Sequence, residues 1–332
     1  MITRNIKVPT GNICIMQGEK GLLEFLSIGD YGRNVNVKAD FLGLKNDING
    51  VPNGEIMPLS DKWVITTSTQ YGCSMGCKFC DVPKVGKGIN ATYEDLKNQV
   101  VNAIMLHPEI KKTKRLNVHY ARMGEPTWNF DVIDFTLDLK DIVKSYLGDS
   151  LVHPVISTML PKNNNKLIPF LHNWIDIKNQ LFNGDAGLQF SINSTNDDQR
   201  EDMFNGSSLS LEEISKIGTE LPFPKGRKYA LNFALADNYE VDAVRLRKLF
   251  NPDKFMVKIT PLHQTYSSEE NGICTTDGYQ YFTPYQQAEK DLINNGFDVL
   301  VFIPSYDEDM GRITCGNAIL SGSYPECEYE EV

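Results

Sequence analysis

The stretch "TQYGCSMGCKFCDVP", residues 69–83, places cysteines at positions 73, 77 and 80. A closed structural zinc site needs four ligands, usually as two separate pairs, and no second C-x2-C pair occurs downstream. Three thiolates on one short loop suit an iron–sulfur cluster in which one iron keeps an open position for a substrate or cofactor. We therefore predict that Cys73, Cys77 and Cys80 are metal ligands, with a zinc ribbon or a redox dithiol as the alternative.

Hydrophobic runs typical of β-strands alternate with helical patterns along most of the chain. The runs lie at residues 62–68, 116–121, 155–159, 188–193, 230–236, 255–260 and 299–304. Such alternation predicts an α/β fold with a parallel sheet and right-handed crossovers, either open and doubly wound or closed into a barrel. In both, the chemistry gathers at the carboxyl ends of the strands. The cysteines follow the first run and "RMGEP", residues 122–126, follows the second, as this arrangement predicts.

Helix signals fill the segments between these runs. Three capping boxes are predicted: Thr92 with Asp95, Ser210 with Glu213, and Thr283 with Gln286. Apolar residues in 135–146 follow the 3.6-residue helical period, and Gly296 is predicted to end the last helix.

The chain divides by composition into three parts. Residues 1–60 are rich in Gly and Asn with short apolar runs, which predicts a small β-rich N-terminal extension. Residues 61–322 hold the strand–helix alternation, and residues 323–332 are predicted to be an acidic C-terminal tail.

Bulk composition narrows the classes of function. The 332 residues include 33 Lys and Arg against 43 Asp and Glu, a formal charge of −10, which disfavours binding of a polyanion by bulk electrostatics. Seven cysteines, an odd number, favour reduced thiols used for metal binding or catalysis over a disulfide framework. We find no signal-peptide pattern and no apolar run of membrane-spanning length, so we expect a cytoplasmic protein without membrane contact.

The spacing C-x3-C-x2-C, with Phe79 before the last cysteine, resembles the motif of the radical S-adenosylmethionine superfamily. This resemblance implies a partial (β/α)6 TIM-like barrel. It also implies a [4Fe-4S] cluster on Cys73, Cys77 and Cys80, whose open iron chelates S-adenosylmethionine and whose electron cleaves it to an adenosyl radical. An external electron donor such as flavodoxin or ferredoxin is then expected.

Four further segments resemble, in the same order, the ribosomal-RNA adenine methylases of the RlmN and Cfr type. They are "ARMGEPTWN", "VISTMLP", "FSINSTNDDQR" and "ITCGNAIL", and the resemblance runs from about residue 60 to residue 320. By position it implies that Gly124 and Glu125 hold the amino end of S-adenosylmethionine, and that Cys315 is the methyl-carrying thiol. The resemblance also implies that the ribose and carboxylate of S-adenosylmethionine contact four residues: Ser157, Ser191, Ile192 and Asn193.

Each of these residues also has a purely structural interpretation. "MGEP" is typical of a turn that starts a helix, strand-end serines satisfy backbone groups, and most free cysteines are ordinary buried thiols. His263 ends a predicted strand on the catalytic side and is predicted to touch the cofactor. Arg122 is predicted to meet an anionic group or to form a surface ion pair.

The chain departs from the methylase pattern at several positions. Thr66 stands where the family has a second cysteine that releases the product by forming a disulfide, so Cys14, Cys274 or Cys327 would have to replace it. The family's Asn-Leu-Ile-Pro-x-Asn segment reads "KITPLH" here, with Lys258 and His263 at the Asn positions. We expect no counterpart of the family's N-terminal RNA-gripping domain, which makes ribosomal RNA a doubtful substrate.

Three functions remain open at this point. The first is methylation of a substrate sp2 carbon through a methylated Cys315, and the second is direct hydrogen abstraction without methyl transfer. The third is a non-enzymatic iron–sulfur or zinc protein. The substrate is RNA, a nucleotide-like small molecule or a peptide.

Overall fold

The structure is a computed structural model that describes residues 1–45, 55–276 and 282–332. Its strands are β1 (Ile2–Val8), β2 (Gly11–Gly18), β3 (Gly21–Ile28), β4 (Val37–Lys38), β5 (Trp63–Thr66), β6 (Gln70–Gly72), β7 (Lys87–Asn90), β8 (Leu116–Tyr120), β9 (Val152–Thr158), β10 (Gly187–Ser191), β11 (Tyr229–Leu235), β12 (Phe255–Pro261), β13 (Val299–Phe302) and β14 (Glu330–Glu331).

The α-helices are α1 (Arg33–Asn36), α2 (Tyr93–Met105), α3 (Asp131–Leu147), α4 (Leu167–Asp176), α5 (Asp197–Met203), α6 (Leu211–Glu220), α7 (Ala243–Leu249), α8 (Tyr266–Glu270), α9 (Thr283–Asn294) and α10 (Tyr306–Met310). The short 3-10 helices are η1 (Asp40–Leu42), η2 (Val82–Lys84), η3 (Pro126–Trp128) and η5 (Ile319–Ser321), and the π-helix η4 (Ile177–Leu181) continues α4.

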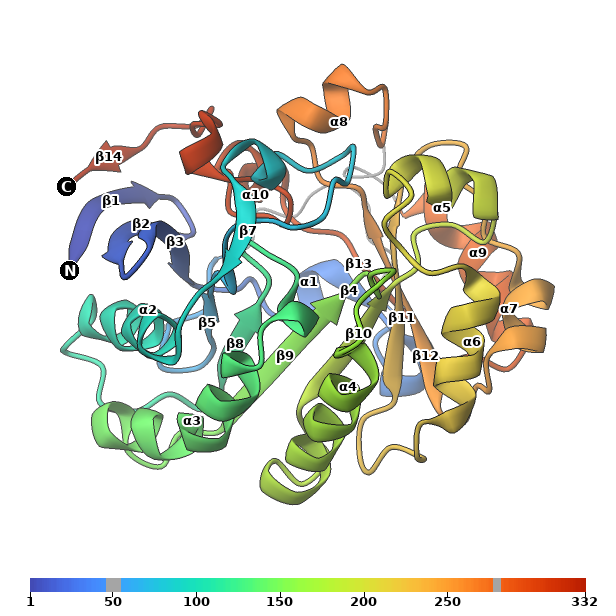
Figure 1. Cartoon of the computed structure of the whole chain (residues 1–332), viewed down its shortest axis with the longest axis horizontal. Coiled ribbons are helices and arrows are strands. Elements are labelled where there is room, and N and C mark those ends of the chain that lie inside the picture. Colours follow the sequence, from blue (N-terminus) through green and yellow to red (C-terminus); the bar gives the residue numbers. More distant parts are fainter. Residues whose placement is uncertain (46–54, 277–281) are drawn as a thin grey trace.

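The main sheet has 12 strands in the order β14-β1-β2-β3-β5-β8-β9-β10-β11-β12-β13-β4. From β5 to β13, neighbouring strands run parallel and follow the order of the chain. Each of the seven runs predicted as strands lies in this part, so the predicted α/β fold with a parallel sheet is confirmed. The sheet curves but stays open, because its two ends pair with other strands and not with each other (Figure 1).

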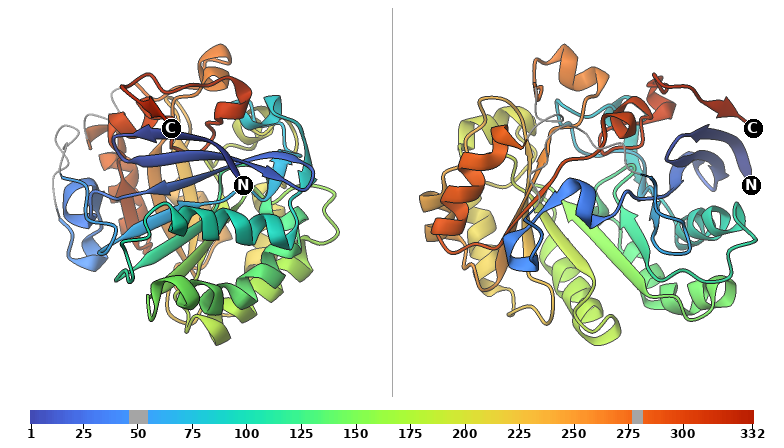
Figure 2. Two further views of the ribbon diagram at one scale, coloured as in Figure 1. Left: turned by 90° about the vertical axis from the view of Figure 1, so that its left-hand side faces the viewer. Right: turned by 180° about the vertical axis from the view of Figure 1, so that it is seen from behind.

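The N-terminal strands extend the sheet at both of its ends. Strands β1, β2 and β3 form an antiparallel meander that pairs with β5, whereas β4 pairs antiparallel with β13 at the opposite edge. Strand β14 pairs with β1, so the two chain termini lie side by side (Figure 2). The division of the chain at residues 60 and 322 stays a prediction.

Helices α2, α3, α4, α6, α7 and α9 lie around the outside of the curved sheet (Figure 1). The main core fills the space between these helices and the sheet; Tyr120 of β8, for example, makes edge contacts with Phe135 of α3 and Trp174 of α4. A second apolar cluster lies between the β1–β3 meander and the C-terminal segment, where Ile13 and Leu26 pack with Ile319.

The predicted helix starts have different outcomes. Capping boxes at Thr92 and Ser210 are confirmed, with both reciprocal hydrogen bonds present. The box predicted at Thr283 is wrong: Phe282 already has helical backbone angles and is the N-cap, so Thr283 lies inside the helix. Gly296 follows α9 with a φ of 89°, as predicted for a glycine that ends a helix.

In the described part of the chain, no helix combines the length and apolarity needed to cross a bilayer.

Candidate active site

The three cysteines lie on a loop between β6 and η2, which we call the cysteine loop (residues 73–80). Cys73 directly follows β6, which forms a small antiparallel sheet with β7, and its N–H donates to the carbonyl of Gly86 at 3.1 Å. The loop therefore starts from a fixed hairpin at the carboxyl end of the parallel strands.

Two segments far along the chain hold the cysteine loop in place. The hydroxyl of Thr265, just before α8, donates to the carbonyl of Phe79 at 2.7 Å. The N–H of Asp81 donates to the carbonyl of Gly316 at 2.8 Å. The segment that carries Cys315 is thus packed directly against the cysteine loop.

Asp81, next to the last cysteine, is a buried brace that the sequence did not reveal. Its carboxylate accepts hydrogen bonds from the Ser267 N–H at 2.9 Å, the Ser267 hydroxyl at 2.7 Å and the Ser323 hydroxyl at 2.7 Å. Burial alone would raise the pKa of Asp81, but these hydrogen bonds outweigh it and hold the pKa below its usual value. A charged carboxylate therefore joins the cysteine loop to α8 and the C-terminal segment.

The thiols lie beside a sulfur-rich apolar cluster. Cys77 Sγ is 3.4 Å from Met159 Sδ, and Cys73 and Cys77 pack against a cluster that includes Met75, Met159, Met203 and Phe204. Burial raises the pKa of all three cysteine thiols of the loop, and their mutual charges add to the effect for Cys77 and Cys80. Three thiols this close together, in apolar surroundings, destabilise one another's charged forms.

A bound metal cation would lower the raised pKa of these thiols, since a coordinating thiol is deprotonated by its metal. Within the described residues, no three Cys, His, Asp or Glu side chains already stand in a ready-made metal site. All seven cysteines are free thiols, including the three on the cysteine loop. Three adjacent thiols in an apolar setting fit the cluster that the family resemblance implies, and Cys73, Cys77 and Cys80 would be the residues that hold it.

Gly124 lies where only a glycine fits. Its φ is 98°, and a Cβ at this position would meet the Gln70 side chain at 2.6 Å. The amide oxygen of Gln70 accepts from the N–H of Glu125 at 3.1 Å and from the N–H of Ser74 at 3.3 Å. Gln70 is 1% exposed and connects the "MGEP" turn to the cysteine loop, a role that sequence reasoning missed.

The Glu125 carboxylate is fully engaged inside the protein. It accepts from the Thr127 N–H at 3.1 Å, the Thr127 hydroxyl at 2.8 Å and the Met159 N–H at 3.0 Å, and the Thr158 hydroxyl also hydrogen-bonds to it. These donors fill the roughly four lone-pair positions of a carboxylate. Glu125 caps η3, which has Pro126 in its first turn, as the turn-forming interpretation of "MGEP" predicts. Its contact with the amino end of S-adenosylmethionine stays a prediction.

The other residues expected to contact S-adenosylmethionine lie at the ends of β9 and β10. Ser157 and Ser191 are partly exposed, each between buried neighbours on its strand. Ile192 is fully buried. Asn193 is 2% exposed, has a φ of 60°, and its side-chain oxygen accepts from the Ala234 N–H at 3.0 Å. The two serines can therefore meet a ligand directly, while Asn193 shapes the turn beside them.

Cys315 lies on the segment after α10, next to the cysteine loop. The residue Cys315 is solvent-exposed. The surrounding protein nevertheless desolvates its thiol, which raises the pKa of Cys315. The nearby charges of Arg122 and Lys258 act in the opposite direction and favour the thiolate. Cys315 also contributes to the raised pKa of Cys77 and Cys80, which places the four thiols in one electrostatic environment.

Arg122 is buried, so the ion pair predicted at the surface is wrong, and the anionic group that it meets is the buried carboxylate of Glu24. Arg122 and Glu24 of β3 are 3% and 0% exposed, and the guanidinium donates twice to one carboxylate oxygen, from Nε at 2.7 Å. The other oxygen of Glu24 accepts from the Leu320 N–H at 3.1 Å, and Arg122 also reaches the Thr314 carbonyl at 3.4 Å. The pair fixes both ends of the segment that carries Cys315.

His263 follows β12 and is oriented by a buried carboxylate. Its Nδ1 lies 3.0 Å from Oδ1 of Asp309, whose other oxygen accepts from the Gln264 N–H at 3.0 Å. The Thr314 hydroxyl donates to the same carboxylate, so His263 and Cys315 are linked through one acidic group. The cofactor contact predicted for His263 stays a prediction.

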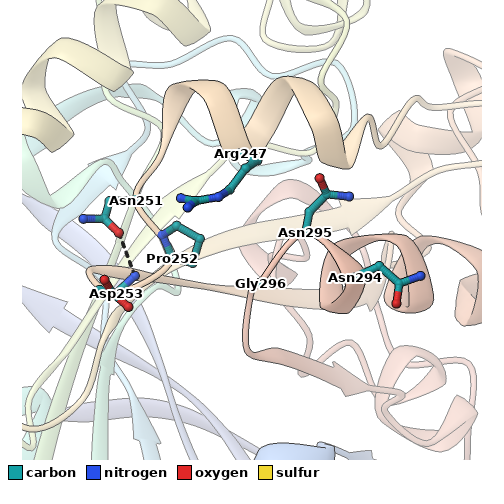
Figure 3. Close-up of a pocket in the computed structure, with 7 residues that line it drawn as sticks. All are labelled: Arg247, Asn251, Pro252, Asp253, Asn294, Asn295 and Gly296. Carbon is teal, nitrogen blue, oxygen red and sulfur yellow. Dashed lines mark hydrogen bonds between the residues drawn. The ribbon is translucent and has the colours of Figure 1, made fainter.

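A surface hollow lies away from the thiols (Figure 3). It has a volume of about 520 Å3 and is lined by Arg247, Asn251, Pro252, Asp253, Asn294, Asn295 and Gly296. These residues precede β12 and β13, at the amino ends of the strands. The hollow is thus at the opposite end of the sheet from the thiols and takes no part in the site.

Comparison with known proteins agrees with this architecture. No protein-family model matches the chain. It is 27% identical over 214 residues to the dual-specificity RNA methyltransferase RlmN of Desulfosudis oleivorans, covering 63% of this chain and 54% of that protein. A probable RlmN of Thermosipho melanesiensis is 28% identical over 202 residues, which are 59% of this chain and 54% of that protein. The chain therefore spans about half the length of the curated relatives it matches.

A solved radical SAM methyltransferase from Sphaerobacter thermophilus has the same fold, with a TM-score of 0.62 and 19% identity. The match covers 96% of this chain and 80% of that one. The chain resembles the RlmN-type radical S-adenosylmethionine methyltransferases. The predicted family resemblance and the predicted partial-barrel architecture are thus confirmed at the level of sequence similarity and fold.

Position 66 departs from the cysteine pattern that the family resemblance implies. Thr66, at the position of the second RlmN-type cysteine, ends β5 and pairs with His119 of β8. Cys14, a suggested substitute, is fully buried in β2 and hydrogen-bonded to Asn5. A hydroxyl, in register with His119 on the neighbouring strand, therefore stands where the family resemblance implies a second cysteine.

Proposed function

We propose that this chain is a radical S-adenosylmethionine enzyme that methylates a substrate sp2 carbon through Cys315. Cys73, Cys77 and Cys80 would hold a [4Fe-4S] cluster, which supplies the electron that cleaves S-adenosylmethionine to a 5′-deoxyadenosyl radical. The proposal is carried by one observation: Gly316, next to Cys315, accepts a hydrogen bond from the N–H of Asp81, the residue that directly follows the cysteine loop.

In the first step, the Cys315 thiolate attacks the methyl carbon of S-adenosylmethionine. The new S–CH3 bond forms as the sulfonium C–S bond breaks, S-adenosylhomocysteine leaves, and the thiol proton goes to solvent. Arg122 and Lys258 support this step because their positive charges favour the thiolate. A second S-adenosylmethionine would then provide the adenosyl radical that removes a hydrogen atom from the methylated cysteine.

Thr66 favours a second candidate function, in which the radical takes hydrogen directly from the substrate. A threonine hydroxyl cannot form the disulfide that would release a covalent product. In this alternative, Cys315 is not methylated and only S-adenosylmethionine cleavage is shared with the first proposal.

The test is anaerobic. The protein is reconstituted with iron and sulfide, given S-adenosylmethionine and a strong reductant, and assayed for 5′-deoxyadenosine and for methylated peptides by mass spectrometry. We expect 5′-deoxyadenosine and a Cys315 peptide heavier by one methylene. Cys315→Ala should keep the formation of 5′-deoxyadenosine and lose the methylated cysteine peptide.

An unmodified Cys315 in a protein that forms 5′-deoxyadenosine would support direct hydrogen abstraction instead. A cluster-loaded protein that forms none would contradict both enzyme proposals.

A further inference from the structure

Partly exposed polar side chains line the inner face of the curved sheet, the face opposite the helices. They are Thr66, His119, Ser157, Gln189, Ser191, Asn232 and Lys258, and each alternates along its strand with buried residues. Three of them stand in register across neighbouring strands: Ser191 of β10 is opposite Asn232 of β11, which is opposite Lys258 of β12. Lys258 thus stands within a polar row on the side of the sheet that the helices leave uncovered.

Lys258 is an enclosed cation without an acidic partner among the described residues. The salt bridges of the described chain do not include it, and its ammonium lies 5.6 Å from the centre of the Phe302 ring. Two other cations near Lys258 are compensated: Lys62 pairs with Asp30 at 2.8 Å, and Arg227 lies 3.8 Å from Asp185. A positive charge in this position lacks the counter-ion that enclosed charges normally have.

Two neighbours show where a ligand would lie. Lys258 and Cys315 are close enough for each to shift the pKa of the other, and Lys258 also acts on His119. The side-chain oxygen of Asn232 is buried and has no hydrogen-bond partner among the described residues. The Asn232 oxygen can accept a hydrogen bond, and the Lys258 ammonium can pair with an anion. Together they fit a ligand that has an acidic group next to an N–H or O–H group.

We propose that Lys258, together with Asn232, binds the anionic group of a small-molecule substrate and holds that substrate near Cys315. The anionic group is a phosphate or a carboxylate. The inference rests on the proposed function only in taking Cys315 as the reacting group. A small molecule suits the site better than RNA, because one enclosed lysine matches one acidic group, whereas a polyanion is bound by many exposed cations.

The test measures how well simple anions protect Lys258 from an amine reagent, with the cluster-reconstituted protein and S-adenosylmethionine present. Inorganic phosphate, acetate and a single-stranded RNA oligonucleotide are the probes. The labelling rate at Lys258 is read by peptide mass spectrometry, with the exposed Lys216 of α6 as internal control. We expect phosphate or acetate to slow labelling of Lys258 at least threefold and to leave Lys216 unchanged.

The relative strength of phosphate and acetate tells which acidic group is preferred. Protection by neither anion, equal protection of Lys216, or protection by RNA alone would overturn the proposal. Binding of the protecting anion, measured by calorimetry, should be lost in Lys258→Met and kept in Lys258→Arg. If Lys258→Met instead keeps anion binding and loses only Cys315 methylation, Lys258 serves the thiol and the proposal is wrong.

The labelling needs no turnover, so its outcome is separate from that of the proposed function. Protection without formation of 5′-deoxyadenosine would leave the anion site in place and remove the radical chemistry. Formation of 5′-deoxyadenosine without protection of Lys258 would support the radical chemistry and remove the anion site.

Discussion

The two faces of the parallel strands differ sharply although they alternate residue by residue. On β11, Leu231 and Phe233 point to the helices and are fully buried, whereas Asn232 between them is partly exposed on the inner face. Strand β12 repeats the pattern, with Val257 and Ile259 buried and Lys258 partly exposed. The outer face therefore supplies the apolar burial that stabilises the fold, and the inner face is left for chemistry.

Near Cys315, the charged groups are of two kinds. Arg122 is buried and paired with Glu24, and it fixes the backbone on both sides of Cys315. Lys258 is surrounded by protein but still partly accessible to solvent, and no acidic side chain among the described residues pairs with it. A paired buried charge holds structure, whereas an enclosed charge without a counter-ion is suited to a ligand.

The largest effect is expected from breaking the buried pair. Arg122→Met leaves Glu24 as an uncompensated charge and should lower the free energy of unfolding by roughly 3–5 kcal/mol. Chemical denaturation followed by circular dichroism measures this loss.

The matched control is the double variant Arg122→Met with Glu24→Leu. Because it removes both charges, it should recover much of the lost stability. A single variant as stable as the parent protein would show that the pair is not the brace described above.

A smaller effect should separate the two faces of one strand. Leu231→Ala removes a fully buried side chain from the outer face and should cost roughly 3 kcal/mol. Asn232→Ala, one residue further on the inner face, should change stability by less than about 0.5 kcal/mol. Thermal unfolding of both variants provides the comparison, and equal losses would contradict the assignment of the two faces.

The sequence was sufficient for the strands, and it placed the three thiols on one loop, whereas their role as metal ligands stays a prediction. Hydrophobic runs mark strands that are buried on at least one side, and the spacing of Cys73, Cys77 and Cys80 is a local pattern. The seven predicted strands were therefore found, although the extension of the sheet by β4 at its far edge was not foreseen. A two-residue strand leaves too short a pattern to recognise.

The braces of the site were not predictable, because their partners are far apart in the chain. Asp81 meets Ser267 and Ser323, and Glu24 meets Arg122, across separations of 98 to 242 residues. No local pattern distinguishes such a carboxylate from a solvated one. Glu125 lies in a local motif, yet its carboxylate also accepts from the Met159 N–H, 34 residues further along the chain, and this contact leaves no local pattern.

The smallest predicted effect is a pH dependence that belongs to Lys258. Burial lowers the pKa of Lys258 to about 8; nearby Cys315 opposes this shift, and Arg227 and Lys62 add to it. The ordinary lysine value, about 10.4, applies in the unfolded chain. Between these two values the unfolded state binds more protons than the folded state, so this lysine makes stability rise with pH.

Lys258→Met should therefore flatten the rise in the free energy of unfolding between about pH 8 and pH 10, by comparison with the parent protein. His119, which also faces Lys258, has its pKa lowered to about 3 by burial and nearby positive charges, so it stays neutral throughout this range. Lys216→Met, on the exposed surface of α6, is the matched control and should leave the slope unchanged. Parallel pH profiles for the parent protein and Lys258→Met would mean that Lys258 is as well solvated as a surface lysine, and the contrast drawn with Arg122 would then fail.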